Sequence, residues 1–363
     1  MKFSYSVSII IPIKVEKKNI FRIQRLDELL QLFTSELHIE NIECIVVDSS
    51  KSFSSDIQKV CQRYQNVHYE YLAMPKVYSA AKARNRGAEL SNGNYLLFYD
   101  VDLVPTHSFF DMVFNDIESI SKEYCAFTIY PCLYLNEKFK NKNIFKQIGT
   151  SIKDIEKRYL EGYNDQVLYL AVNTSTILLS RQYFLEIGGY DQNFQGHGYE
   201  DFELIHRLYM AYPIIERMDD YPIDYKTPFP AEYKGFRKYF AYYALENFFK
   251  GAYTLHLWHP RPLSNKYYKV RKENALYFSN LLKNSMSSKI TQQYIDKSLP
   301  NDIQEYVKSL CKKYEFDKNY CIGFYRLNKQ ANHLQHTNLL YRKLRKLILN
   351  PKQFVKDIKI LKF

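Results

Sequence analysis

The amino-acid sequence predicts an α/β fold in which helices flank a mostly parallel central sheet. Over the first part of the chain, apolar β-branched runs alternate with segments whose apolar residues recur at helical spacing. This alternation is typical of a parallel sheet with crossover helices. With 46% hydrophobic residues in a chain of 363, a large core can form, which excludes global disorder.

Residues 1–105 are expected to form the first half of this fold. The expected strands are Val7–Pro12, Ile42–Asp48, Val67–Leu72 and Tyr95–Tyr99. The expected helices are Phe21–Glu36, Ser54–Tyr64 and Ser79–Leu90, the last one stopped by Ser91-Asn92-Gly93. In open sheets of this kind, ligands bind beyond the carboxyl ends of the strands. Pro12, Asp48 and Asp100 all stand at such ends.

The pattern changes after Pro105, and a second part is expected over residues 106–262. Its expected helices are Ser108–Ser121, Gln182–Ile187, Glu200–Met210 and Tyr239–Lys250. Its expected strands are Cys125–Leu135, broken by Pro131, and Thr174–Leu179. A third part, residues 263–363, is polar, Lys-rich and mostly helical in pattern.

The net charge of +12 and the pI of about 9.1 favour an anionic partner, such as phosphates, nucleic acid or a membrane surface. No recognisable nucleic-acid-binding motif accompanies this charge, so we expect no nucleic-acid partner. The six cysteines have no C-x-x-C pair and no zinc-ligand spacing, which favours buried thiols in a reducing cytoplasm. No apolar run approaches the length of a membrane-spanning helix.

The central motif of the chain is Asp100-Val101-Asp102, which directly follows a buried strand. Side chains two residues apart in an extended segment point the same way, so both carboxylates can face one point. Two like charges placed there need a cation beside them. Mg²⁺ or Mn²⁺ carrying nucleotide phosphates would satisfy them, because these ions take oxygen ligands. A polar turn after a strand is the alternative interpretation.

Two further segments carry charged groups that could converge on the same edge. The helix from Ser79 holds Lys82, Arg84 and Arg86, which could face a diphosphate or could form a solvated helix face. Four of the eleven glycines, at positions 188, 189, 196 and 198, precede Glu200-Asp201. Tight backbone geometry there could expose a carboxylate as a base, although acidic residues are also common in a first helical turn.

The segment Thr254–Pro260 contains His256 and His259 on either side of the only tryptophan, Trp258. Two imidazoles at this spacing could supply a metal ligand, and a structural role is the alternative. The final segment, Leu339–Phe363, has eight Lys or Arg residues against one Asp. It predicts either a peripheral membrane contact or a helix packed on the rest of the protein.

Seven motifs, in order, resemble those of bacterial family 2 glycosyltransferases with the GT-A fold, a Rossmann-like fold. More narrowly, they resemble capsule and cell-surface polysaccharide transferases whose second half is similar to the β-1,4-galactosyltransferase C-terminal region. The motifs cover roughly residues 5 to 262. They are Val7–Pro12, Val46–Ser50, Ala81–Gly87, Tyr99–Asp102, Gly188–Asp191, Gly196–Asp201 and His256–Pro260.

The resemblance implies a role for each matching position. Residues 1–105 would be the nucleotide-sugar-binding half and 106–262 the acceptor-binding and catalytic half, with 263–363 as a helical basic extension. Donor nucleotide contacts would come from Pro12, Asp48, Lys82, Arg84 and Asp100. The metal, Mn²⁺ or Mg²⁺, would be bound by Asp102, His259 and His256. Asp201 would be the catalytic base, and Glu200 would hold the donor sugar or the acceptor. The acceptor contacts would be His197, Tyr199 and Trp258.

One departure from the family pattern affects the acceptor. The family usually carries tryptophan in the glycine loop where this chain has His197, so the usual aromatic platform for the acceptor sugar is missing. A single base without a second nucleophilic carboxylate implies direct displacement with inversion. The expected partners are a UDP-sugar donor of a hexose or N-acetylhexosamine and a saccharide or lipid-linked saccharide acceptor.

The expected location is the cytoplasm, and a peripheral position at the inner face of the cell membrane is the alternative. There the basic C-terminal helix would contact the membrane surface or capsule-assembly proteins. Two other functions stay open from the sequence. A nucleotidyltransferase would be expected to carry a Gly-rich phosphate loop after the first strand, and Pro12-Ile13-Lys14-Val15 has none. A non-catalytic subunit of a polysaccharide assembly complex would not need the intact carboxylate sets.

Overall fold

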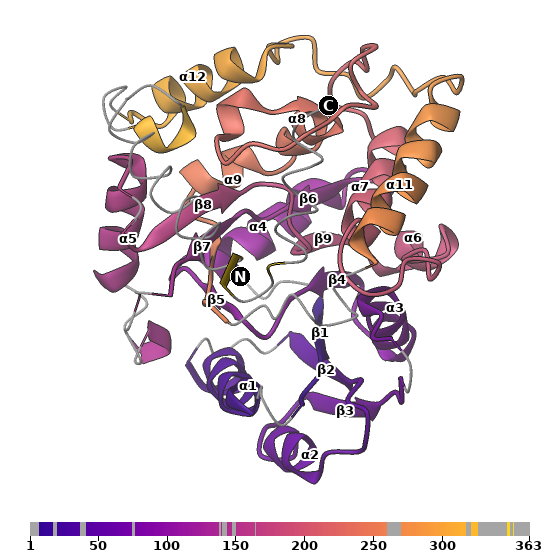
Figure 1. Ribbon diagram of the computed structural model, residues 1–363, viewed down its shortest axis with the longest axis vertical. Coiled ribbons are helices and arrows are strands. Elements are labelled where there is room, and N and C mark those ends of the chain that lie inside the picture. The colour runs from indigo at the N-terminus through magenta and orange to yellow at the C-terminus, as the bar shows by residue number, and fades with distance from the viewer. Residues whose placement is uncertain are drawn as a thin grey trace.

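The structure is a computed structural model that describes residues 7–16, 20–36, 41–74, 77–137, 139, 144–146, 150–163, 165–259, 270–316, 321–325, 347–348 and 351. It is a mixed α/β structure, as predicted, with the first half of the chain in the lower part of Figure 1 and the second half above it. The basic segment Leu339–Phe363 lies outside the described residues, apart from 347–348 and 351.

The main sheet has six strands in the order β3-β2-β1-β4-β9-β6. They are β1 (Val7–Ile13), β2 (Ile42–Asp48), β3 (Val67–Tyr71), β4 (Tyr95–Phe98), β6 (Phe127–Ile129) and β9 (Ile177–Ser180). The first four in spatial order are parallel, whereas β9 runs antiparallel to both β4 and β6. The four predicted parallel strands are confirmed, and strands from the second half of the chain extend the same sheet.

Three helices connect the parallel strands: α1 (Phe21–Gln31), α2 (Ser55–Cys61) and α3 (Ala80–Leu90). Across the sheet, the connections from β1 to β2 and from β2 to β3 move toward one edge, and the connection from β3 to β4 returns past β1 toward the other edge. Right-handed crossovers therefore place α1 and α2 on one face and α3 on the other, as Figure 1 shows. The predicted helix through Glu36 ends as a π-helical turn, η2 (Leu32–Glu36).

A second sheet has the order β5-β12-β7-β8. Its strands are β5 (Leu103–Pro105), β7 (Cys132–Leu135), β8 (Val167–Ala171) and β12 (Thr254–His256). Strand β12 pairs antiparallel with β5, and the Leu257 N–H donates to the Asp102 carbonyl over 2.8 Å. This pairing brings the histidine segment beside Asp102, although 154 positions separate Asp102 from His256.

The remaining helices surround these sheets (Figure 1). They are α4 (Phe109–Ile120), α5 (Thr150–Leu160), α6 (Arg181–Glu186), α7 (Glu200–Ala211), α8 (Phe236–Ala241), α9 (Leu245–Phe249), α11 (Arg271–Ser285) and α12 (Ile303–Lys313). Short turns are η3 (Ile144–Lys146), η4 (Pro230–Glu232) and η6 (Ile322–Phe324), and β10 (Asp224–Tyr225) pairs with β11 (Lys234–Gly235).

Two predicted elements are each divided in the structure. The predicted strand Cys125–Leu135 becomes β6 and β7, which belong to different sheets, because Pro131 stands between them and cannot donate a ladder hydrogen bond. The predicted helix Tyr239–Lys250 becomes α8 and α9, which are separated at Ala244 with a ψ of −37° and a φ of −129°.

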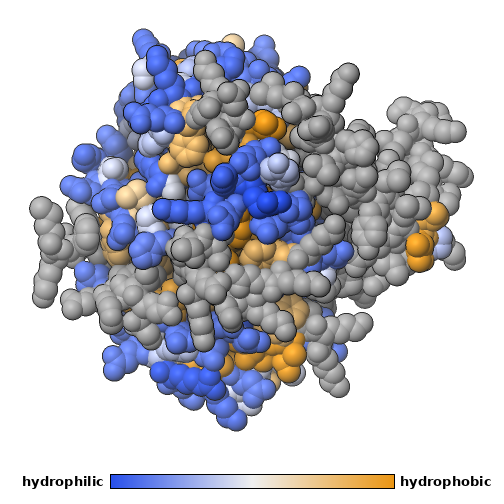
Figure 2. All heavy atoms as spheres, turned by 90° about the vertical axis from the view of Figure 1, so that its left-hand side faces the viewer, coloured by the Kyte–Doolittle hydropathy of each residue, from blue (hydrophilic) through white to orange (hydrophobic). Residues whose placement is uncertain are grey.

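The core is continuous across both sheets, and its largest buried side chains are aromatic, among them Tyr99, Tyr130, Tyr190 and Tyr209. On the face shown in Figure 2, hydrophilic residues cover much of the described surface, with smaller hydrophobic areas between them. Within the part of the chain that the structure describes, no helix is both long and apolar enough to cross a membrane.

Candidate active site

Arg84 is the centre of a buried charge cluster at the carboxyl edge of the main sheet. Its side chain is only 3% exposed. Its Nη1 donates to Asp201 Oδ1 over 2.7 Å, and its Nη2 donates to Asp100 Oδ1 over 3.0 Å. Glu200 Oε1 lies 3.9 Å from the same Nη1. One guanidinium therefore joins the aspartate after β4 to both carboxylates that open α7.

The backbone before α7 is shaped by positive φ angles. Gly188, Gly189, Gly196 and Gly198 all have φ between +67° and +92°, and Tyr199 has φ +79° at the N-cap of α7. These left-handed conformations turn the chain sharply, so that Glu200 and Asp201 enter the first turn of α7 facing Arg84. The sequence pattern predicted this tight geometry, and the structure confirms it.

Asn85 ties this glycine loop to α3. The Tyr190 N–H donates to Asn85 Oδ1 over 2.8 Å, and Asn85 Nδ2 donates to the Tyr190 carbonyl over 2.9 Å. A Cβ atom on Gly189 would lie 2.6 Å from Asn85 Oδ1, so glycine permits this close approach. The Tyr190 ring lies under Arg84, with 5.2 Å between the guanidinium carbon and the ring centroid.

The acid–base properties of the cluster follow from its burial. Burial raises the pKa of Glu200 above its usual range, and the charge of Asp201 adds to this effect while Arg84 opposes it. Burial also raises the pKa of Asp201, against the charge of Arg84. Glu200 Oε2 is buried and has no hydrogen-bond partner among the described residues. The pair therefore favours holding a proton, with Asp201 the more exposed of the two.

Asp102 lies in a second charge cluster, beside the first. Arg25 Nη1 donates to Asp102 Oδ1, Arg22 Nη2 lies 3.5 Å from Oδ2, and His259 Nε2 lies 3.8 Å from Oδ2. Burial raises the pKa of Asp102, but the positive charges of Arg22, His259 and Arg25 outweigh it and leave the pKa below its usual range. Asp102 is therefore an ionised carboxylate in a cationic environment.

His256 and His259 stand next to each other near Asp102. Their ring centroids are 5.3 Å apart, and the His256 ring stacks on Tyr134 at 4.2 Å. A carboxylate and two imidazoles are a suitable ligand set for Mn²⁺ in kind. Across the described ranges, however, no three His, Cys, Asp or Glu side chains are already arranged to hold a metal ion, and both Asp102 oxygens face arginines.

Asp48 and Pro12 line the sheet edge from inside. Asp48 is fully buried, and its carboxylate accepts hydrogen bonds from the Ser50 N–H at 2.9 Å and from the Tyr69 hydroxyl at 3.0 Å. Pro12 is also buried and pairs in register with Val47. Asp48 thus shapes the turn after β2 through Ser50.

Lys82 differs from the buried Arg84 in its surroundings. It is exposed and lines a cavity of about 450 Å³ on the outer side of α3. Leu72, Met74, Ser79 and Gln195 contribute to the same cavity. The structure therefore brings Arg84 into the charge cluster and places Lys82 in a different environment.

The predicted acceptor residues lie around the start of α7 and the end of β12. The Tyr199 hydroxyl donates to Asp224 Oδ2 over 2.7 Å, and Arg271 lies over the Tyr199 ring at 5.1 Å. His197 is half-buried in the glycine loop. The Trp258 carbonyl accepts a hydrogen bond of 2.9 Å from Arg25 Nη2.

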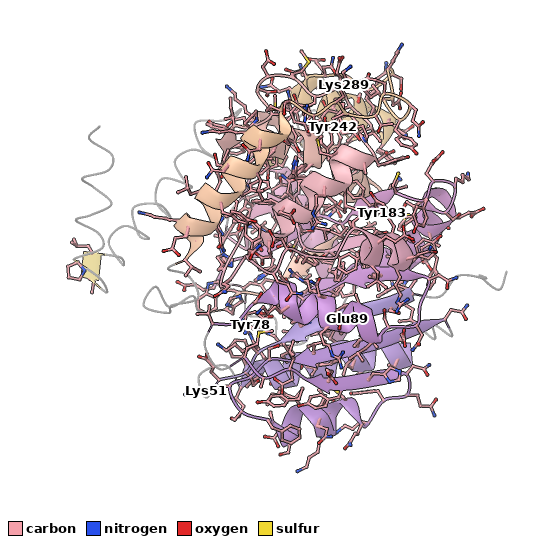
Figure 3. All side chains as sticks on the ribbon, turned by 90° about the vertical axis from the view of Figure 1, so that its right-hand side faces the viewer. Lys51, Tyr78, Glu89, Tyr183, Tyr242 and Lys289 are labelled. Carbon is pink, nitrogen blue, oxygen red and sulfur yellow. The ribbon has the colours of Figure 1, made fainter. Side chains whose placement is uncertain are left out.

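Sequence reasoning missed four residues of the site. Arg22 and Arg25 reach Asp102 from α1, and the Ser175 hydroxyl donates to Asp100 Oδ2 over 3.0 Å. Tyr78, labelled in Figure 3, directly precedes the first turn of α3 and is electrostatically coupled to Arg84, Asp100, Arg22 and Glu200. The spacing of Arg22 and Arg25 on one helix face was the only local signal for any of them.

These features define an α/β protein with carboxylates clustered at the carboxyl edge of its main sheet. Sequence comparison identifies the family. Residues 8–284 match the family described as Glycosyltransferase like family 2. The chain therefore belongs to this glycosyltransferase family, with the GT-A fold. No curated protein matches the chain.

Several solved structures are similar to this chain at low identity. S. aureus TarS 1–349 is 14% identical with a TM-score of 0.35, and the match covers 56% of this chain and 55% of that one. The same protein in complex with UDP gives a TM-score of 0.36 at the same identity and coverage. The match thus spans about half of the length of TarS 1–349. The mannosyltransferase PcManGT from Pyrobaculum calidifontis, in complex with GDP-Man and Mn²⁺, is 12% identical with a TM-score of 0.42, covering 96% and 82%.

Proposed function

We propose that the protein is an inverting, metal-dependent glycosyltransferase that moves a hexose or N-acetylhexosamine from a UDP-sugar to a saccharide or lipid-linked saccharide acceptor. One observation carries this proposal. Arg84 holds the donor-side Asp100 and the acceptor-side Asp201 on a single guanidinium, over 3.0 and 2.7 Å. A donor at Asp100 and an acceptor at Asp201 would therefore meet at adjacent positions.

Asp201 is the proposed base. Because a sugar hydroxyl is a poor nucleophile, its proton must be taken as its oxygen attacks the anomeric carbon. The bond from that carbon to the diphosphate oxygen breaks at the same time, and its electron pair leaves with UDP. Arg84 orients Asp201 and favours its ionised form, while the buried Glu200 would hold the donor sugar or the acceptor. Attack opposite the leaving group inverts the anomeric configuration.

The donor nucleotide is proposed to lie along the edge formed by Pro12, Asp48 and Asp100, with Lys82 and Arg84 near the diphosphate. Asp102, His259 and His256 would hold Mn²⁺ or Mg²⁺, because their ligand chemistry fits and Asp102 lies 3.8 Å from His259. When bound, such an ion supplies positive charge that stabilises the departing diphosphate. The acceptor is proposed to contact His197, Tyr199 and Trp258.

We propose capsule or another cell-surface polysaccharide as the product and the inner face of the cell membrane as the working location. Contacts with the membrane or with assembly proteins would come from the basic C-terminal segment Leu339–Phe363. In the proposed division of labour, residues 1–105 bind the nucleotide sugar, 106–262 bind the acceptor and carry the base, and 263–363 form the extension. The main sheet contains strands from the first two parts, which supports one shared catalytic unit.

A panel of UDP-sugars tests the proposal through Mn²⁺-dependent release of UDP, with saccharide acceptors. We expect one donor to give turnover, and Asp201→Asn to lower it by about 10²–10⁴-fold while UDP binding persists. Asp111→Asn, an exposed aspartate in the first turn of α4, is the matched control and should keep full activity. Absence of UDP release with every sugar, or near-normal turnover by Asp201→Asn, would contradict the proposal.

A further inference from the structure

Two arginines of α1 occupy both oxygens of Asp102. Arg25 contacts Oδ1 through Nη1 and reaches the Trp258 carbonyl with Nη2 over 2.9 Å. Arg22 Nη2 lies 3.5 Å from Oδ2 and its Nη1 donates to the Lys14 carbonyl over 3.0 Å. Asp102 itself is 5% exposed. The carboxylate proposed to bind a metal is thus already neutralised by groups of the chain itself.

A divalent cation cannot simply join this arrangement. It would need an Asp102 oxygen that now faces an arginine, either Oδ1 at Arg25 or Oδ2 at Arg22, and it would stand beside two guanidinium groups of the same sign. Binding of the metal therefore requires that at least one of these two arginines leaves Asp102. A displaced guanidinium needs a new anionic partner, because an unpaired charge in a partly buried site is costly.

The charge balance indicates which ligand would receive the arginines. Two guanidiniums face one carboxylate, so the cluster already carries excess positive charge, and the metal adds two more. Arg22 Nε is buried and has no hydrogen-bond partner among the described residues. Planar guanidiniums match phosphate oxygens in geometry and charge. A diphosphate arriving with the metal would supply the oxygens that Asp102 gives up.

We propose that Arg25 and Arg22 are ligands of the donor diphosphate, and that they hold Asp102 only until a divalent cation takes it. This inference rests on the proposed function, since it requires a metal-bound nucleotide donor. In the ligand-free protein the arginines compete with the metal. In the loaded protein they bind the diphosphate together with the metal.

The two proposed roles of Arg25 predict opposite effects of its removal on Mn²⁺ binding and on UDP binding. A purely structural role does not, so the two explanations can be distinguished. Removing Arg25 should strengthen binding of Mn²⁺ alone, because a competitor for Asp102 is gone. It should weaken binding of UDP at saturating Mn²⁺, because a diphosphate ligand is gone. An arginine that only packs α1 against the sheet would, when removed, weaken both or leave both unchanged.

The test uses the full chain and its Arg25→Gln variant. Free Mn²⁺ is counted by electron paramagnetic resonance, and UDP binding is measured by calorimetry with and without Mn²⁺. We expect Arg25→Gln to bind Mn²⁺ about three- to fivefold more tightly without nucleotide. We expect it to bind UDP at least about tenfold more weakly at saturating Mn²⁺. The matched control is Arg63→Gln, an exposed arginine paired with Asp27, which should change neither constant.

Arg22→Gln keeps the inference testable if Arg25→Gln does not fold. Loss of the Arg22 guanidinium should also strengthen Mn²⁺ binding without nucleotide and weaken UDP binding at saturating Mn²⁺. The inference is overturned if the affinities for Mn²⁺ and for UDP both fall, or both stay unchanged, in a folded variant. The proposed function would still stand in that case, provided that the wild-type protein binds UDP and turns over. Wild-type UDP affinity that is independent of Mn²⁺ would also overturn it. Wild-type protein that binds no UDP at all would reject both proposals.

Discussion

Replacing Arg84 with methionine should lower the free energy of unfolding by about 3 kcal/mol near pH 8. The change removes the guanidinium but keeps an apolar stem of similar length, so little cavity is created. It leaves Asp100, Asp201 and Glu200 without the cation that contacts them at 3.0, 2.7 and 3.9 Å. Removing one partner of a buried ion pair typically costs about 3–5 kcal/mol. We take the lower end because Asp100 is 39% exposed.

The loss should depend on pH with a definite sign. In the variant, the pKa values of Glu200 and Asp201, already raised by burial, rise further because the opposing charge of Arg84 is gone. The folded state then binds more protons than the unfolded state, so its stability falls as pH rises above the unfolded carboxyl values of about 4. The destabilisation should therefore be smaller at pH 5 than at pH 8.

Urea denaturation at both pH values measures this effect. Arg86→Met is the matched control, since Arg86 lies on the same helix but is 38% exposed and pairs with Glu70 and Glu89 on the surface. Its loss should cost about 1 kcal/mol or less. A loss below about 1 kcal/mol for Arg84→Met, or a loss that does not grow between pH 5 and pH 8, would refute the reasoning.

Two further changes test the packing around the site. Burial, with the charges of Arg217 and Arg207, lowers the pKa of His206 to about 4. As the pH is lowered from about 6.5 to about 4, the unfolded chain therefore binds a proton at His206 before the folded protein does, and the free energy of unfolding decreases. His206→Gln should reduce the drop in unfolding free energy between pH 7 and pH 4.5 by about 2 kcal/mol; an unchanged drop would contradict this. In Gly87→Ala, the new Cβ would lie 2.4 Å from Ile10 Cγ2. Urea denaturation should show that the free energy of unfolding falls by about 1–2 kcal/mol, although alanine has the better helix propensity. A more stable variant would be inconsistent with the close approach of α3 to Ile10 of β1.

Local patterns predicted the parallel strands β1, β2 and β4 because each of these is a short apolar run ended by a local signal. Proline at position 12 and aspartate at position 48 mark the ends of β1 and β2 closely. The glycine loop was equally visible, since positive φ angles demand residues that tolerate them. The site could be predicted to this extent because its residues follow strands or glycines directly.

The rest of the site depends on contacts between distant segments. The sequence near Arg25 does not indicate that it reaches Asp102, because the contact depends on how α1 lies relative to Asp102 and to the segment after β12. Asp48 was predicted from its strand-end position, but only the structure shows its carboxylate turned inward to Ser50 and Tyr69. Side-chain direction after a strand is decided by neighbours that the local pattern does not contain.

The hydrogen-bonded pair β5–β12 makes residues 106–253 a closed excursion of the chain. The polypeptide departs from the neighbourhood of Asp102 and comes back to it, so the spacing between Asp102 and His259 is set by backbone pairing at the two ends. Of the proposed acceptor residues, His197 and Tyr199 lie inside this excursion, whereas Trp258 follows it. Recombination between relatives with crossovers at these two strands would exchange His197, Tyr199 and the proposed base as one cassette and keep the proposed donor residues of the first half.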